Sequence, residues 1–403
     1  MPARRTPAVA GYLAGATTAR LGDEMTAPAL LLLALAATGT TSAGPLLVAL
    51  LSAAAALGGP LVGGLLDRSG SPGRLIGWSL LGCGAGIAVI AVFLGPAPLP
   101  VVLVTAVAVG LLRPVLSGGW SSQLRHVVDD HRLPRAVGLD AVTFDLAAFA
   151  GPGLAGLSAL LMGARSAVLA ASALLLIAVP LARAALPDRR PPDHRSGQLV
   201  PALAAILRLA ALRRATLVST LSYVGMGLLS TSLPLLSSRV LGDTDVAPLL
   251  VAVLAGSGLA ANLLINLRRS VPDPDRLLLA TVCVLVPGSA LVVLPVIIDG
   301  GAPVAILLCV AAMIAVGMAD GPQLAAVLRI RHREAPEQLR AGIFTTGASI
   351  KIFGYAIGAG LCGPLSGRSL TATLLAATGC QAAAVIGYAV SAGRARVGAL
   401  PAA

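Results

Sequence analysis

The chain has 403 residues, of which 57% are hydrophobic and 11% are charged. Because an average soluble domain carries about 25% charged residues, this composition excludes a soluble protein of this size. The formal net charge of +12 would suit a nucleic-acid-binding surface, but the arginines lie mostly in short segments between apolar runs, so we expect no nucleic-acid partner.

Twelve apolar runs follow one another, and each is long enough to cross a hydrocarbon core of about 30 Å as a helix. Lipid cannot satisfy free backbone groups, so every run is expected to be helical. The predicted fold class is therefore an all-α polytopic membrane protein with twelve transmembrane helices. The predicted spans are 8–37, 44–66, 75–95, 99–122, 136–161, 164–186, 214–238, 246–267, 277–298, 303–328, 340–362 and 370–392.

The first span carries three charged residues, which is costly inside a membrane and marks a candidate functional group. Arg20, Asp23 and Glu24 are spaced i, i+3 and i+4, so they share one helix face. Two interpretations stay open. The three charges neutralise one another as a structural group, or they form a cation or proton site that faces a central cavity.

A short glycine-rich stretch, Gly63 to Gly70, separates the second and third spans and predicts a tight turn. Its residues Gly63, Asp67, Arg68 and Gly70 fit the pattern Gly-x-x-x-Asp-Arg-x-Gly. The pattern resembles the corresponding loop of the major facilitator superfamily. The resemblance implies two pseudo-symmetric six-helix bundles, transport by alternating access, and a conformational latch at this loop. The alternative is a plain loop that carries a topology charge.

This loop departs from the family pattern just after Gly70. The family usually continues with two basic residues, whereas this chain has Ser71 and Pro72, and the next basic residue is Arg74. We include Arg74 in the predicted latch loop.

Four further charges lie deep in the predicted spans. At 1.5 Å per residue, each lies about 14 to 18 Å from the nearest basic residue at the end of its span. Aligning the two halves of the chain predicts two ion pairs of opposite polarity, Arg113–Asp145 and Asp320–Lys351. They are either structural pairs or a device in which a carboxylate takes up a proton during transport. Asp140 lies nearer the end of its span and is expected to be solvated.

The fifth span carries a second motif. Gly138, Gly151, Pro152 and Gly156 match the exporter signature Gly-x8-Gly-x3-Gly-Pro-x2-Gly-Gly of the same superfamily, with alanine in place of two other glycines. Small residues permit close helix contact, and a proline inside a helix favours a kink. This resemblance to antiporters favours proton-coupled export over import. The alternative is ordinary glycine-rich packing.

A polar segment from Pro187 to Arg195 cannot enter the membrane and is predicted to be a linker. It leads into 199–214, whose apolar residues have helical spacing and predict an amphipathic helix on the inner membrane surface. The predicted domains are a bundle at 1–186, a cytoplasmic linker at 187–213 and a second bundle at 214–403. Matching segments recur at offsets of 202 to 205, as where the run 45–51 resembles 248–254. Parallel repeats of this kind are typical of the superfamily.

The arginines outside the spans predict the orientation. With the N-terminus inside, the outer segments contain Arg165, Arg239 and Arg368, and the remaining basic residues between spans fall on the inner side. This positive-inside bias places both termini in the cytoplasm of a multi-pass cell-membrane protein.

Several polar and aromatic residues within the spans are candidates for the lining of a central cavity, although most of them equally suit helix packing. These are Trp120, Phe144, Tyr223, Asn262, Asn266, Gln323 and Tyr355. The five cysteines show no metal-ligand spacing, so no metal site is expected. Catalytic and phosphate-binding motifs are also missing from the sequence, so an enzyme is not expected.

These observations predict a secondary-active transporter, and specifically a proton-coupled exporter of a small, amphipathic or drug-like molecule. The proton gradient would drive transport without a cofactor, the lipid bilayer would surround the protein, and we expect a monomer. The alternatives are an importer of a nutrient or metabolite with the same fold, by symport or uniport, and a membrane sensor that transports nothing.

Overall fold

The apolar runs form long helices because each residue's backbone groups are then paired within the segment. The computed structural model describes residues 6–39, 43–189, 199–240, 247–268, 270–298 and 301–397. Its helices are α1 (Thr6–Thr38), α2 (Ala43–Arg68), α3 (Pro72–Phe93), α4 (Leu99–Leu112), α5 (Gly118–Ser122), α6 (Leu124–Val127), α7 (Leu133–Met162), α8 (Ala164–Ala185), α9 (Leu199–Arg208), α10 (Ala210–Val240), α11 (Ala247–Leu267), α12 (Pro274–Leu291), α13 (Leu294–Ile297), α14 (Gly301–Glu334), α15 (Arg340–Ser366) and α16 (Leu370–Val397). The described residues also include two 3₁₀ turns, η1 (Arg113–Val115) and η3 (Glu337–Leu339).

Twelve segments of the described chain are long and apolar enough to cross a membrane, which confirms the predicted number of spans. Their ends differ from the prediction by a few residues at most places. The largest difference is at α14, which continues to Glu334 instead of ending at 328. Arginine is a good helix former, so the basic residues after 328 extend the helix beyond the apolar segment.

The fourth span is not one continuous helix. After α4 ends at Leu112, the chain passes through η1 and a non-helical Ser117 before α5 begins. Pro114 lacks the N–H group that a regular α-helix would require there. The break lies beside Arg113, one of the deep charges, and irregular backbone at membrane depth is tolerated where protein or a water-filled path surrounds it.

The chain divides into two compact units. Unit 1 comprises Met1–Ala205 with Ala335–Ser349, and unit 2 comprises Ile206–Glu334 with Ile350–Ala403. Unit 1 thus includes the segment 335–349, which our sequence-based division assigns to the second bundle; the domain boundaries stay a prediction. The predicted amphipathic helix ends earlier than expected, because α9 stops at Arg208 and the next residues begin α10.

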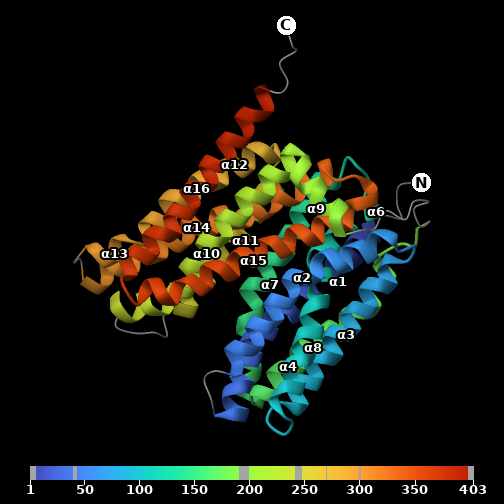
Figure 1. Ribbon diagram of the computed structural model, residues 1–403, viewed down its shortest axis with the longest axis horizontal. Helices are drawn as coiled ribbons and strands as arrows, with labels where there is room; N and C mark the ends of the chain where they lie inside the picture. Colours follow the sequence, from blue (N-terminus) through green and yellow to red (C-terminus); the bar gives the residue numbers. More distant parts are fainter. Residues whose placement is uncertain are drawn as a thin grey trace. The chain divides into compact units, whose positions relative to one another are not determined.

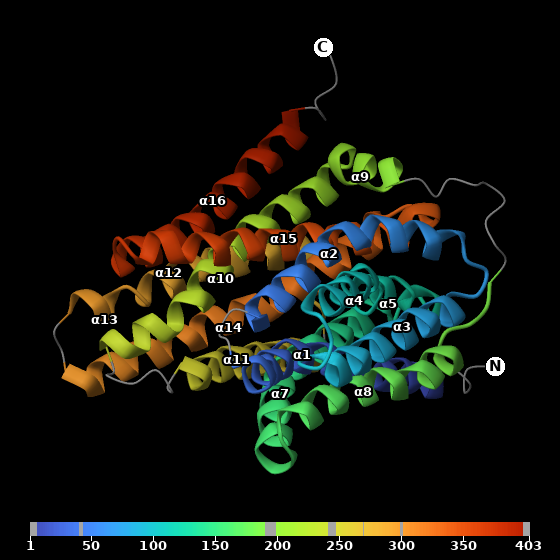
Figure 2. The same ribbon diagram turned by 60° about the horizontal axis from the view of Figure 1, so that its bottom comes forward.

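In unit 1, α1 packs against α7 and α8, and α3 packs along α8 (Figure 1). The pair α2 and α4 lies beside them (Figure 2). Small residues make the close approach of α2 and α4 possible. A methyl group on Gly110 would lie 2.5 Å from the carbonyl oxygen of Leu51 and 2.6 Å from Ala54 Cβ.

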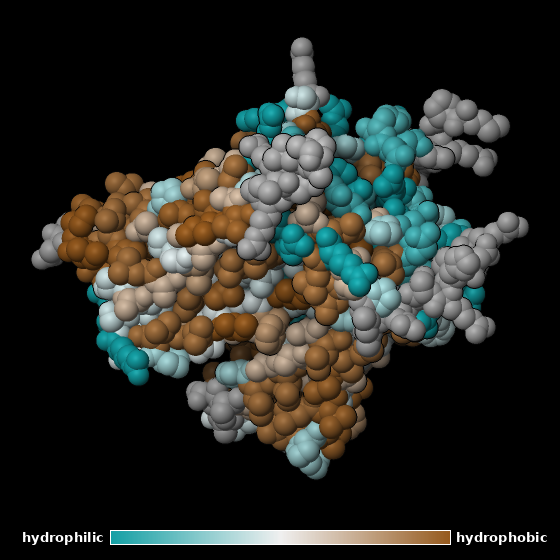
Figure 3. All heavy atoms as spheres, turned by 45° about the horizontal axis from the view of Figure 1, so that its top comes forward, coloured by the Kyte–Doolittle hydropathy of each residue, from teal (hydrophilic) through white to brown (hydrophobic). Residues whose placement is uncertain are grey.

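In unit 2, α14 packs against both α11 and α12, and α16 packs against both α10 and α12. Its core contains Leu233 and Leu236 of α10 together with Met313 and Val316 of α14. Large apolar side chains also cover much of the helix surfaces, as the brown areas of Figure 3 show. Such exposure is expected of helices that face lipid.

Replacing Gly321 with alanine is expected to destabilise unit 2 by about 1–3 kcal/mol, because overpacking a tight contact forces helices apart. The new methyl group would lie 2.7 Å from the carbonyl oxygen of Gly258 on α11. Gly360→Ala is the matched control, since a methyl group there would meet no atom within 4 Å in the described structure. Thermal unfolding of the two purified variants in detergent measures the difference. Equal unfolding midpoints would contradict the close contact of α11 and α14.

Candidate functional site

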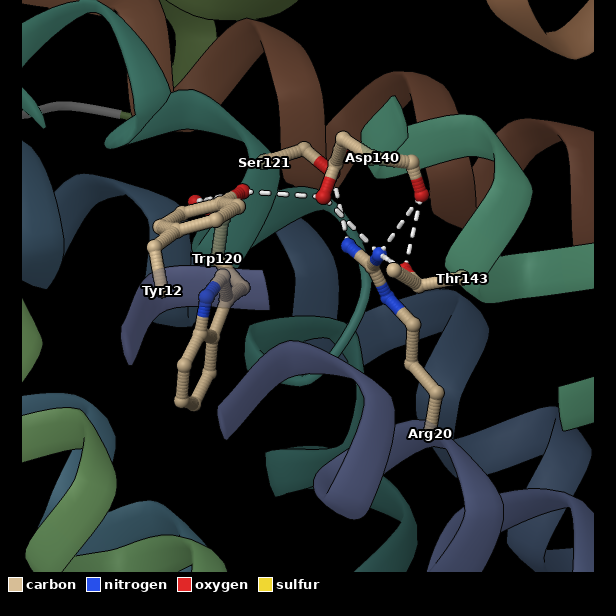
Figure 4. Close-up of polar contacts among 6 residues, drawn as sticks. All are labelled: Tyr12, Arg20, Trp120, Ser121, Asp140 and Thr143. Carbon is tan, nitrogen blue, oxygen red and sulfur yellow. Dashed lines mark hydrogen bonds and ion pairs between the residues drawn. The ribbon is translucent and has the colours of Figure 1, made fainter. Parts of the chain in front are cut away.

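Arg20 and Asp140 form a buried ion pair at the centre of a hydrogen-bond network that joins α1, α5 and α7 (Figure 4). Arg20 Nη1 lies 2.8 Å from Asp140 Oδ1, and the Arg20 side chain is 3% exposed. Ser121 Oγ donates to Asp140 Oδ2 at 2.6 Å and accepts from Arg20 Nη2 at 3.0 Å. Thr143 Oγ1 accepts a further bond from Arg20, and Tyr12 donates to Asp140 Oδ1 at 3.0 Å.

This network corrects two expectations. Asp140 is fully buried instead of solvated, because a cation and two hydroxyl groups replace its water. Arg20 turns towards Asp140 and lies 3.5 Å from the centre of the Phe144 ring, so it neutralises a residue of another helix. The predicted cavity residue Trp120 is buried too, and its backbone carbonyl accepts from Tyr12. The network is suited to holding helices together.

Asp23 and Arg113 form the second ion pair of unit 1. Arg113 Nε donates to Asp23 Oδ1 at 2.6 Å, and both side chains are about one-fifth exposed. The carboxylate that holds Arg113 therefore comes from α1, whereas the sequence paired Arg113 with Asp145 of α7. Spacing along a helix gives the depth of a charge but does not say which neighbouring helix meets it.

Glu24 lies next to this pair, and the surroundings of its carboxylate differ from those of Asp23 and Asp140. Its side chain is exposed, and within the described structure no hydrogen bond or ion pair of its carboxylate is found. An exposed carboxylate in the middle of a 30-residue span is stable only if it faces water or carries a proton.

The exporter-type motif on α7 lies directly beside Glu24. A methyl group on Gly151 would lie 2.7 Å from Glu24 Cβ, so a glycine at 151 lets α1 and α7 approach closely at this acid. Helix α7 continues through Pro152. Gly138 is buried, whereas Gly156 faces open space. Asp145, also on α7, is half-buried.

Lys351, one of the two deep charges of unit 2, lies over a tyrosine ring that neighbours a second tyrosine. Lys351 is 7% exposed, and its Nζ lies 3.6 Å from the centre of the Tyr223 ring. The rings of Tyr223 and Tyr355 are 6.3 Å apart. The charge of Lys351 also acts on Asp320, and the predicted ion pair between these two residues stays a prediction. Asp320 Oδ1 is a buried oxygen that accepts no hydrogen bond from the described residues.

Asn262 of α11 and Gln323 of α14 are buried, and Asn266 of α11 is half-buried. Gln323 Nε2 donates to Ser222 Oγ at 3.2 Å, and Ser222 Oγ donates to Gln381 Oε1 at 2.7 Å, which joins α14, α10 and α16. Asn266 Nδ2 donates to the carbonyl oxygen of Asn262 at 2.9 Å, one turn earlier on α11. These contacts are typical of polar side chains that join or brace membrane helices.

The glycine-rich loop places Asp67 against the first turn of α15. Asp67 Oδ1 accepts from the backbone N–H of Ala341, and Asp67 Oδ2 accepts from that of Gly342, each at 2.7 Å. The first N–H groups of a helix lack an acceptor within the helix, and a carboxylate there also complements the helix dipole. We call this contact the Asp67 cap. It gives the predicted latch residue a defined partner.

Gly63, another residue of the predicted latch loop, also lies close to α15. A methyl group on Gly63 would lie 2.7 Å from Gly342 Cα, so Gly63 lets α2 approach α15 closely. The side chains of Arg68 and Arg74 are exposed.

Three groups near the ends of the spans were missed by the sequence reasoning. In the sequence, Tyr12 cannot be told from a residue that only packs within an apolar helix. Asp275 of α12 forms ion pairs with Arg214 and with Arg333, the latter at 2.6 Å, and thereby connects α12 to α10 and α14. Arg189 lies in the predicted linker, three residues past the predicted end of span six. Its closeness to the end of that span was the sequence signal that could have identified it.

Among the described residues, no cluster of His, Cys, Asp or Glu is arranged to hold a metal ion.

His126 of α6 is a second unpredicted member of the loop region. Arg189 Nη1 lies 2.9 Å from His126 Nε2, so the neutral ring accepts a hydrogen bond from the guanidinium. Burial, followed by the charges of Arg189 and Arg340, lowers the pKa of His126 to about 4. Glu337 acts in the opposite direction and Arg125 in the same direction.

Acidification is therefore expected to destabilise the protein through His126. In the unfolded chain this histidine takes up a proton near pH 6.5, whereas in the folded protein it does so only near pH 4. Between these values the unfolded state binds more protons, so stability falls as the pH is lowered through this window. Thermal unfolding from pH 7 to pH 4 should show a smaller loss for His126→Gln than for the parent protein. Parallel pH profiles would contradict the lowered pKa.

Comparison with known proteins agrees with this arrangement of helices. A model of the Major Facilitator Superfamily matches residues 12–358. No curated protein sequence matches the chain.

Solved structures with the same fold include two transporters. The human organic anion transporter MFSD10 (TETRAN) is 17% identical, with a TM-score of 0.76 over 96% of this chain and 100% of that chain. A bacterial homologue of the iron transporter ferroportin, in an outward-facing state, is 13% identical, with a TM-score of 0.76 over 96% of this chain and 99% of that chain. At these identities the likeness concerns the fold alone.

Proposed function

The chain belongs to the Major Facilitator Superfamily and is a membrane transporter, and we propose that it exports a small amphipathic molecule in exchange for protons. The observation that carries this proposal is the exposed carboxylate of Glu24 in the middle of α1, packed against Gly151 of the exporter-type motif. Neither a buried ion pair nor a hydrogen bond of the described structure holds this carboxylate in the charged form.

Proton coupling follows from the chemistry of such a group. A carboxylate in a region of low polarity prefers the protonated form, whereas a nearby cation or water favours the charged form. Glu24 lies beside Asp23 and Arg113, which already form a pair. A change in the access of water to Glu24 would therefore shift its protonation and bind or release a proton.

We also propose that the protein lies in the cell membrane with both termini in the cytoplasm, which the arginine bias of the loops supports. We propose that the protein acts as a monomer, with the proton gradient as its energy source and no cofactor. The Asp67 cap is proposed to be the latch that opens and closes during alternating access.

A transport assay in oriented vesicles tests the direction and the coupling. The purified protein would be placed in vesicles with its cytoplasmic face outward and offered two amphipathic probes, the cation ethidium and the anion carboxyfluorescein. An exporter driven by protons should accumulate at least one probe when the lumen is acidic, and a proton ionophore should abolish the accumulation. The anionic probe is included because one structural neighbour is an organic anion transporter.

The alternatives give different results in the same vesicles. An importer by symport would accumulate a nutrient when protons move with it, which requires the opposite gradient. A uniporter would equilibrate its substrate without responding to the gradient. A sensor would transport neither probe under any gradient.

A further inference from the structure

Arg68, in the last turn of α2, is the basic residue that this helix itself places at the start of the loop between α2 and α3. The last residues of α2 present carbonyl oxygens that lack a partner within the helix, and a positive charge is favourable at this end. Ser71 and Pro72 follow Gly70 directly. The side chain of Arg74, the next arginine, is exposed on α3.

Arg189 adds a second positive charge at this end of α2, from the segment that follows α8. Its backbone N–H donates to the carbonyl oxygen of Gly70 at 2.7 Å. Its guanidinium donates through Nη2 to the carbonyl oxygen of Leu66 at 3.0 Å and through Nε to that of Ser69 at 3.3 Å. The planar guanidinium can reach several carbonyl groups in one orientation, which a lysine ammonium does less well.

The residue held in place by these contacts is Asp67, which follows Leu66 in the sequence. Asp67 is 6% exposed, and both of its carboxylate oxygens are engaged in the cap on α15. The charge of Arg189 also acts on this carboxylate. Without Arg189, the loop would still contain Asp67 but would lose the contacts that hold the backbone around Asp67 in place. The Asp67 carboxylate would then be less well aligned with the N–H groups of Ala341 and Gly342.

We propose that Arg189 is the positioning residue of the Asp67 cap, and that the linker after α8 thereby controls how firmly α2 holds the start of α15. Arg189 contacts the loop and His126, so it acts through Asp67 and not on the transported molecule. The importance of the cap for transport rests on the proposed function, but the contact itself does not.

Hydrogen–deuterium exchange tests the contact without any transported molecule. The N–H groups of Ala341 and Gly342 lie in the first turn of α15, where their protection depends on Asp67 because an intrahelical acceptor is lacking. Exchange would be followed by mass spectrometry on the full chain in lipid nanodiscs, with peptides covering 62–72 and 337–346. Arg189→Ala should accelerate exchange of the two amides by at least about five-fold, since local opening sets the rate.

Three further variants separate positioning from general stability. Arg189→Lys should give an intermediate rate. Adding Ser71→Arg to Arg189→Ala, which places a guanidinium beside Gly70, should restore most of the protection. Arg183→Ala is the matched control, because this arginine of α8 lies over the Trp78 ring of α3; its exchange at 337–346 should equal that of the parent protein.

Two results would overturn the proposal. Exchange of Ala341 and Gly342 in Arg189→Ala within about two-fold of the parent rate would mean that Asp67 holds its position unaided. Acceleration of every peptide to the same extent, without rescue by Ser71→Arg, would make Arg189 a general stabiliser of unit 1. If Arg189→Ala accelerates exchange as expected but the vesicle assay shows no proton-driven accumulation, only the proposed export function is contradicted.

Discussion

Replacing Glu24 with glutamine is expected to reduce proton-driven accumulation of the transported probe by at least about ten-fold, because an amide cannot change its charge state. The substitution keeps the size of the side chain and removes no described hydrogen bond. Exchange of probe across the membrane without a gradient should persist, since that reaction needs no proton. Vesicle accumulation and counterflow, measured on the same preparation, separate the two effects.

Suitable controls show whether the effect belongs to Glu24. Glu334→Gln changes a half-buried acid that pairs with the exposed Arg333 at 2.7 Å. Ion pairs near the surface contribute little, so transport by this variant should be unchanged. Accumulation that survives in Glu24→Gln but is lost in an Asp145→Asn, Asp320→Asn double variant would assign coupling to the deep charges that the sequence singled out first. Loss of accumulation in Glu24→Gln, with accumulation retained in the double variant, would support Glu24 as the coupling residue.

Replacing Arg20 with methionine is expected to be among the most destabilising single changes in unit 1. Removing one partner of a buried ion pair leaves the other charge without compensation and costs about 3–5 kcal/mol. Asp140, the residue left behind, is fully buried, and the two hydroxyl donors around it cannot replace a cation. The unfolding temperature in detergent, and the yield of monodisperse protein, should both fall.

A second substitution makes this result specific. Combining Arg20→Met with Asp140→Leu removes both charges and should recover part of the stability, because an apolar pair of similar volume can replace a buried ion pair. Arg74→Met, at an exposed arginine of α3, should leave the unfolding temperature unchanged. An unfolding midpoint of Arg20→Met within about 2 °C of the parent would contradict a structural role for the pair.

The contrast between Arg20 and Glu24 explains the different roles that we assign to neighbouring charges. Both lie on α1, one turn apart, and the sequence grouped them with Asp23 on one face. In the folded chain Arg20 is enclosed by α5 and α7, Asp23 is paired with Arg113, and Glu24 stays exposed. Three adjacent charges therefore serve a structural network, an ion pair and a candidate proton site.

The sequence by itself determined the class of the protein. Apolar runs of sufficient length predicted twelve helices, and the structure confirms that number in the part of the chain that it describes. The loop pattern around Asp67 identified the family that the comparison supports. These inferences succeed because hydrophobic length and short-range motifs depend on residues that are close together in the chain.

The partners of the charges were decided only by the tertiary structure. Helix spacing predicted a deep position for Arg113 and paired it with Asp145, whereas the described ion pair of Arg113 is with Asp23. The acceptor network of Asp140 and the contacts of Arg189 also join segments more than one hundred residues apart. The rotation of each helix about its axis is set by packing against its neighbours, so the sequence could place these charges along the helices but not against one another.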